Sequence, residues 1–388
     1  MSLHTDTLTH LDTTAAHEWD ALHTQDNPFL NHAFLNNLEQ QQCLGARIGW
    51  LPQHLLVRDA AEHLVGALPL YLKTNYFGEF VFDGAWASAY EQNGLNYYPK
   101  LVSAIPFSPI ASARFLTHQN MAATEQETIK QTLHSALIEK LETQQLSSAH
   151  ILFAQNSDMD WLEQQGYLRR LQYQYQWKNH SYNSFDDFLG EFRSRKRKDL
   201  RKERERLHSD GISIQRFHGN ELPEELWPTV YAFYASTFHK KGNYPALTLA
   251  FFKQTALQMG AQMLILLAQH EQRWVAGVIN FIGTQAMYGR YWGCLEDYDA
   301  LHFELCFYQG IEYCIEKNLQ RFEPGVQGEH KITRGFMPTE TWSAHWIRHA
   351  DFKHAISRFL KQETDYLKTS LPELEALAPF RRATSDND

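Results

Sequence analysis

The stretch RWVAGVIN, residues 273–280, is an apolar run typical of a buried strand, and HLVGALPL at residues 63–70 is its counterpart in the first half of the chain. Each stretch is followed by a short run with aromatic residues and then by a tryptophan, Trp86 in the first half and Trp292 in the second. An aromatic residue predicted to open a helix lies at the same interval after each tryptophan, Tyr97 and Phe303. This faint repetition predicts a chain built from two related halves.

Both halves alternate strands and helices as an α/β layer architecture does. In the first half, residues 125–141 follow a helical pattern, and residues 149–154 and 167–177 read as strands. In the second half, a charged helical segment at residues 185–207 precedes strands within residues 263–292. A further helix with one apolar face follows, carried by Leu301, Leu305, Tyr308, Ile311 and Ile315.

The chain has 388 residues, which exceeds the size at which one hydrophobic core stops growing, so two domains are expected. A polar stretch at residues 178–184 interrupts the strand and helix patterns and marks the boundary. We therefore expect an α/β fold with mixed sheets, with an N-terminal domain over residues 1–180 and a C-terminal domain, which carries the site, over residues 181–388.

The composition of the chain limits the cellular locations and the classes of binding partner to be expected. No apolar stretch approaches the roughly 20 residues that cross a bilayer, and the first residues lack the basic and apolar regions of a secretory signal. A cytoplasmic location without a transmembrane helix is expected. A net charge of -9 argues against broad attraction to nucleic acid or anionic membrane, although a local basic patch can override it. The cysteines lack a CxxC pair and are expected to be reduced, buried thiols: Cys43, Cys294, Cys306 and Cys314.

The strongest candidate for a site is the glycine-punctuated segment EPGVQGEHKITRGF, residues 323–336. Glycines allow backbone to approach a ligand closely, and the polar residues between them supply donors, acceptors and titratable groups. If residues 329–334 are extended, Glu329 and Lys331 share one side and His330 and Arg334 the other. The alternative is a solvated loop with a surface ion pair.

A second candidate is the basic run RSRKRKDLRKERER, from Arg193 to Arg206. Such a helix can meet the phosphates of a cofactor, a tRNA or a lipid-linked substrate. Asp199, Glu203 and Glu205 also permit ion pairs at helical spacing, so a solvated helix face is the alternative and the commoner explanation.

Other catalytic signatures are missing from the sequence. His345, His349 and His354 lack an HExxH pattern and a third ligand, so no metal site is predicted. The sequence has no GxSxG elbow, no Walker loop and no GxGxxG motif after a strand. Hydrolase, P-loop ATPase and dinucleotide-dependent functions therefore lose their usual support.

Several long blocks, in family order, resemble the FemAB-like GNAT family of peptidoglycan biosynthesis and recognition proteins. They are WASAYE (residues 86–91), YYPKL (97–101), PFSP (106–109), LHFELCFYQG (301–310) and the segment 325–338. The resemblance implies tandem GNAT folds, each with central strands that splay apart to admit an acyl donor. It also implies an N-acyltransferase that moves an acyl or aminoacyl group from a thioester or a charged tRNA to a primary amine.

That activity needs a base for the amine and a donor to the carbonyl oxygen. Under this resemblance Glu329 or His330 is the candidate base, and Lys331 and Arg334 are candidate anion or carbonyl contacts. The remaining candidates for substrate or donor binding are Gln327, Gly328, Glu304, Tyr308 and Trp292.

A small thioester donor such as acyl-CoA is slightly favoured over a tRNA held by Arg193–Arg206, because the net negative charge works against a large polyanion. The stretch from Gly293 to Leu305 lacks the Q/RxxGxG/A pattern of ordinary acetyl-CoA enzymes, although backbone amides at a helix N-terminus can still bind phosphate. A competing hypothesis is a noncatalytic recognition protein that binds a cell-wall precursor or peptide.

Overall fold

The computed structural model describes residues 2–24, 26–326 and 328–381, which form two compact units. The first unit holds the described residues up to 172 together with 246–251 and 340–369, and the second holds the others. The units are therefore not the contiguous halves 1–180 and 181–388. Residues 340–369 belong to the first unit because β15 (Met337–Ile347) pairs antiparallel with β8 (Ser148–Ala154) there, from Trp342 onward.

The first unit contains two sets of paired strands. One is an antiparallel sheet in the order β1 (Leu3–Leu8), β3 (His54–Asp59), β4 (Leu64–Leu68), β7 (Leu116–Thr117). In the other, β2 (Trp50–Pro52) pairs with β5 (Tyr71–Lys73), and β5 with β6 (Lys100–Ser103). The strand β6 then runs parallel to β8.

Helices cover these strands, and their apolar faces supply the core. They are α1 (Ala16–Asp20), α2 (His32–Gln40), α3 (Gly84–Gln92), α4 (Ala123–Thr143) and α5 (Met159–Gln164). In α4 the buried residues Ile129, Leu133 and Leu137 recur at helical spacing and pack in one cluster with Val57 and Leu68.

The second unit is built on an antiparallel meander of β10 (Ser213–His218), β11 (Met263–His270), β12 (Arg273–Ile282) and β13 (Ala286–Cys294). The short strand β14 (Arg321–Glu323) adds parallel to β13 and pairs antiparallel with the end of β9 (Leu168–Lys178). No helix among the described residues is long and apolar enough to span a bilayer.

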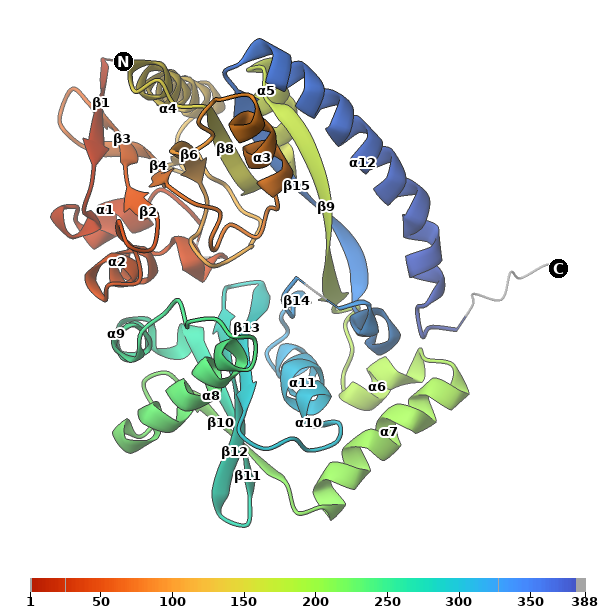
Figure 1. The fold of residues 1–388 in the computed structure, drawn as a ribbon. Helices are drawn as coiled ribbons and strands as arrows, with labels where there is room; N and C mark the ends of the chain where they lie inside the picture. The colour runs from red at the N-terminus through yellow and green to blue at the C-terminus, as the bar shows by residue number, and fades with distance from the viewer. Residues whose placement is uncertain (1, 25, 327, 382–388) are drawn as a thin grey trace. The chain divides into compact units, whose positions relative to one another are not determined.

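The helices of this unit are α6 (Phe185–Gly190), α7 (Ser194–Ser209), α8 (Trp227–His239), α9 (Leu249–Met259, which begins in the first unit), α10 (Leu301–Phe303), α11 (Gln309–Glu316) and α12 (Ala350–Ala376, which ends here). Figure 1 shows α8 and α11 on either side of the meander. The charged segment 185–207 is thus two helices and not one. Gly293 lets α8 approach β13, since a Cβ there would lie 1.6 Å from the carbonyl oxygen of Phe233.

The matching intervals after Trp86 and Trp292 are wrong as evidence for a repeat. Trp86 lies in α3 and Tyr97 in the loop before β6, whereas Trp292 lies in β13 and Phe303 ends α10. The halves correspond in topology instead, because each unit contains a pair of parallel strands, β6 with β8 and β13 with β14.

Candidate functional site

The parallel strands β13 and β14 stay together over only three residue pairs. Ala286 to Tyr288 pair with Arg321 to Glu323, after which β14 ends while β13 continues to Cys294. A β-bulge lies at the same point of β13, since Asn280 pairs with Gly289 and Ile279 with Tyr291, leaving Arg290 as the extra residue. Bulges bend a strand and redirect its side chains, and they are frequent near functional sites.

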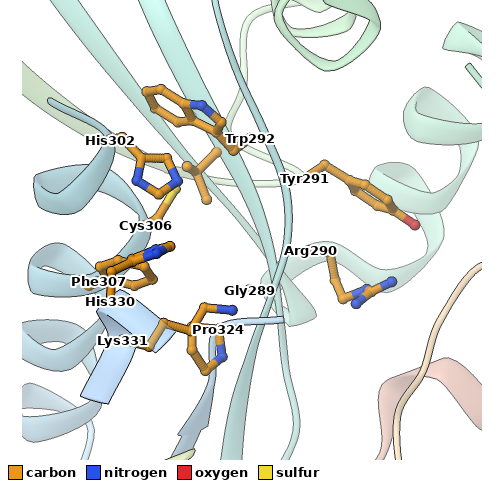
Figure 2. A pocket seen from close by; sticks show the side chains of 11 residues that line it. Gly289, Arg290, Tyr291, Trp292, His302, Cys306, Phe307, Pro324, His330 and Lys331 are labelled. Carbon is orange, nitrogen blue, oxygen red and sulfur yellow. The ribbon is translucent and has the colours of Figure 1, made fainter. Parts of the chain in front are cut away.

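A pocket of about 130 Å³ opens where the two strands part. Its walls come from β13, from the helical segment after Leu301 and from the glycine-punctuated segment, as Figure 2 shows. The lining residues are Val278, Gly289, Arg290, Tyr291, Trp292, His302, Cys306, Phe307, Pro324, His330 and Lys331.

One wall of the pocket is a helix with an irregular turn. The helical stretch from Leu301 to Glu316 passes through a π-helical turn at Glu304–Tyr308, between α10 and α11. Such turns are frequent at functional sites. The pocket side of this stretch carries His302, Cys306 and Phe307, while Tyr308 and Ile311 pack into the core.

A second wall is a short 3₁₀ helix over Glu329–Arg334, so the extended conformation considered for these residues is wrong. Consequently Lys331 and Arg334 are both buried, whereas Glu329 and His330 are exposed. Gly328 precedes the turn with φ 109°, and a Cβ at this position would lie 2.3 Å from Cε1 of His330. Glycine suits this backbone conformation and leaves room for the imidazole in its present position.

The pocket is electropositive. None of the described lining residues is acidic, and Lys331, 4% exposed, donates from Nζ to the carbonyl oxygen of Gly325 at 2.7 Å. Burial lowers the pKa of Lys331 to about 8, with Arg290 adding to the effect. Burial, reinforced by nearby cations, lowers the pKa of His302 to about 4 and also lowers that of His330. Both imidazoles are therefore neutral near pH 7.

Arg334 and Tyr308 form a network beside the pocket but do not line it. Nε of Arg334 donates to the Tyr308 hydroxyl at 3.0 Å, and that hydroxyl donates to Glu203 at 2.7 Å. The guanidinium lies 3.4 Å from the centre of the Phe303 ring and also donates to the carbonyl oxygen of His330 at 3.3 Å. The network thus fixes the 3₁₀ turn that carries His330 and Lys331.

Of the other residues predicted from the sequence, one lines the pocket and the rest do not or lie outside the described residues. Trp292 lines the pocket. Glu304 is 2% exposed and forms a bidentate ion pair with Arg204, at 2.8 and 2.9 Å, away from the lining. Glu329 lies outside the lining. Gln327 lies outside the described residues.

Sequence reasoning missed several lining residues, notably His302, Cys306 and Arg290. His302 and Cys306 are four residues apart on the helix whose apolar face was recognised, so a polar second face at the same spacing was the available signal. Arg290 had no comparable signal, because its place depends on the bulge.

The basic run lies on α7, and only part of it is paired. Arg204 contacts Glu304 and Glu312, Arg201 contacts Asp186, and Arg206 contacts Asp210 and Asp299. Across the described ranges, five cations of the run have no hydrogen-bond or ion-pair partner: Arg195, Lys196, Arg197, Lys198 and Lys202. A hollow of about 420 Å³ runs beside α7, lined by Ser194, Arg197, Lys198, Arg201, Lys202 and Glu205.

The loop before Leu301 does not fit a coenzyme A diphosphate. Residues 295–300 contain no glycine and carry the carboxylates of Glu296, Asp297 and Asp299. These are paired with Arg273, Lys240 and Arg206 respectively, so those three cations are already engaged. A diphosphate would meet like charges where a nest of free backbone amides would be needed.

Comparison with known proteins agrees with this architecture. FemX is similar at 10% identity, over 84% of this chain and 93% of FemX, with a TM-score of 0.51. L-PGS from Bacillus licheniformis is similar at 10% identity, over 88% and 98% of the two chains, with a TM-score of 0.50. A tandem GNAT protein from the clavulanic acid biosynthesis pathway matches 89% of this chain and 98% of its own at 12% identity, with a TM-score of 0.45. A search of curated proteins found no match.

The fold is thus confirmed as a mixed α/β tandem of GNAT-like folds. The chain belongs to the FemAB-like family, described as peptidoglycan biosynthesis/recognition, whose match spans residues 10–382.

Proposed function

We propose that this protein is an N-acyltransferase of peptidoglycan metabolism that transfers an acyl or aminoacyl group to a primary amine in the pocket between β13 and β14. The observation that carries the proposal is the parting of these two strands at Gly289 and Pro324, with two neutral imidazoles and a buried lysine in the opening. A cytoplasmic location is part of the proposal, since precursors and activated acyl donors are made there.

In this proposal His330 accepts the proton that the attacking amine loses as the new amide bond forms. His330 is favoured over Glu329 because it lines the pocket and its pKa is lowered, so it is present as the base near pH 7. Lys331 stabilises the negative charge that develops on the carbonyl oxygen. The leaving thiol or hydroxyl departs with the proton that His330 took from the amine. Trp292 forms a wall, Gly328 sets the imidazole position, and Arg334 with Tyr308 holds the turn.

The donor is an activated ester or thioester. Acyl-CoA would need its diphosphate near residues 295–300, where paired carboxylates stand, so a charged tRNA contacting the unpaired cations of α7 is the better-supported donor. We infer that α7 follows the phosphate backbone while the aminoacyl end enters the pocket.

Transfer to a purified peptidoglycan precursor, with acyl-CoA or aminoacyl-tRNA as donor, tests the function. We expect His330→Ala and Lys331→Met to lower kcat about a hundredfold or more. Tyr244→Ala, at a residue 87% exposed away from the pocket, is the control and should leave kcat unchanged. Full activity in both pocket variants overturns the site, and saturable precursor binding without turnover supports a recognition protein instead.

The donor is tested separately by tRNA binding at several salt concentrations. Binding through α7 should weaken steeply with salt, and Arg197→Glu with Lys198→Glu should remove it. Binding that is insensitive to salt, or a coenzyme A species copurifying with the native protein, would exclude tRNA as the donor.

A further inference from the structure

In the first unit, one loop reverses the usual burial of side chains. Between residues 73 and 83 the three charged side chains are buried, with Lys73 0%, Glu79 3% and Asp83 2% exposed. The exposed side chains are aromatic: Tyr76 71%, Phe77 38%, Phe80 37% and Phe82 72%. We call residues 74–83 the aromatic loop. Exposed apolar groups gathered in this way mark an interaction surface.

The aromatic loop is held from beneath by hydrogen bonds along its length. Nζ of Lys73 and Nε1 of Trp50 both donate to the carbonyl oxygen of Phe77, at 3.0 and 2.8 Å. Nζ of Lys100, a fully buried residue, donates to both Glu79 and Asp83. The carbonyl oxygen of Phe82 accepts from Arg170 at 3.0 Å. The rings are therefore presented by a fixed support.

The loop also contains residues in a strained region of backbone conformation. Phe80 has φ 59°, in the left-handed region that bulky residues rarely adopt. Gly78, with φ 81°, has no room for a side chain, because a Cβ would lie 2.5 Å from the ring of Phe107. Strained residues persist where the surroundings over-determine them, and they cluster at sites that hold ligands.

The charge of the loop limits what can bind it. Phosphate-bearing partners need free cations, and both lysines of this region are engaged with partners beneath the loop. An anionic membrane is disfavoured for the same reason. Flat, rigid rings without exposed charge suit an uncharged ligand that has both apolar faces and hydroxyl groups.

We propose that the aromatic loop binds the uncharged sugar rings of peptidoglycan, an inference that rests on the proposed function. Aromatic faces stack on the C–H faces of a pyranose ring, and the Tyr76 hydroxyl can hydrogen-bond a sugar hydroxyl.

The test is direct binding of an N-acetylglucosamine trimer to the full-length protein without any acyl donor, followed by calorimetry and saturation-transfer NMR. We expect the double variant Tyr76→Ala/Phe82→Ala to lose about tenfold in affinity. The matched control is Tyr366→Ala, which removes a residue equally exposed, 72%, on α12 of the same unit and should bind as the wild type does. Thermal unfolding of each variant shows whether it is folded.

The outcomes separate this inference from the proposed function. Lys331→Met should retain trimer binding, so a protein that binds the trimer but transfers no acyl group fails only as a transferase. Absence of trimer binding in the wild type, or equal binding in the double variant, overturns the inference. Binding to neutral phosphatidylcholine vesicles through these rings, with no affinity for the trimer, also overturns it in favour of a lipid surface.

Discussion

The imidazole rings of His302 and His330 lie with their centroids 6.1 Å apart and their planes at 67°. They come from different walls of the pocket, and among the described residues no side chain donates to or accepts from their ring nitrogens. His302 also contacts Trp292 edge-on at 5.1 Å, which fixes its ring. Two proton acceptors therefore face the same small volume.

The activity is expected to survive moderate acid. Because the pKa of His330 is lowered, the neutral imidazole persists below pH 6.5, and kcat should fall only as pH drops through that lowered value. His330→Gln should lower kcat about a hundredfold and remove this fall of kcat at acid pH, the acid limb of the pH–rate profile. His302→Gln should leave the acid limb in place. A pH–rate profile in which His302→Gln abolishes the limb would assign the base to His302.

The pH–rate profile is expected to fall on the alkaline side as well. Lys331 has a pKa of about 8, and only its protonated form stabilises an oxyanion, so kcat at saturating amine should fall as pH rises through about 8. Lys331→Arg, which keeps its charge, should move this fall to higher pH. An unchanged alkaline limb in that variant would contradict the role of Lys331.

Gly328→Ala tests the backbone at the edge of the pocket. An alanine at φ 109° with its Cβ against the His330 ring should destabilise the protein by about 1–3 kcal/mol and lower kcat. Gly190→Ala is the matched control, since no atom lies within 4 Å of the added Cβ and the residue ends helix α6. Urea unfolding and the transfer assay measure the two effects, and equal behaviour of the two variants would argue against a special role of Gly328.

Glu304 is expected to act through stability. Arg204→Met would leave the buried Glu304 carboxylate without its bidentate partner, at a cost of about 3 kcal/mol. The double variant Arg204→Met/Glu304→Met should recover most of that loss, because it removes both charges. Denaturant unfolding checks the stability, and kcat per folded molecule should stay near the wild-type value. A selective loss of kcat would instead make Glu304 part of the site.

A buried histidine pair predicts sensitivity to acid in the first unit. Nδ1 of His150 and Nδ1 of His345 lie 2.6 Å apart, and burial lowers the pKa of both well below the ordinary value. The unfolded chain therefore binds protons that the folded protein does not, so the free energy of unfolding should fall as pH drops below about 6.5. His345→Gln should reduce this dependence between pH 6.5 and 5, whereas His349→Ala, an exposed control, should not. An identical pH dependence in both would refute the assignment.

The sequence predicted the strands and helices well where the apolar pattern was regular. Residues 125–141 lie within α4, and residues 149–154 lie within β8. The conformation of residues 329–334 was not predictable, because two glycines with positive φ, Gly328 and Gly335, enclose a turn whose period is set by tertiary contacts of Arg334. The place of His302 in the pocket was missed although its spacing from Cys306 was visible in the sequence, because the other walls come from β13 and from residues 329–334.

The unit assignment has a practical consequence for dissecting this protein. The chain passes from one unit to the other after residues 172, 245, 251, 339 and 369. No single cleavage or truncation can therefore release either unit intact, and a C-terminal deletion before residue 340 would take away β15, the partner of β8, in the unit formed mainly by N-terminal residues. Expression of isolated units would need circular permutation or the joining of separate segments.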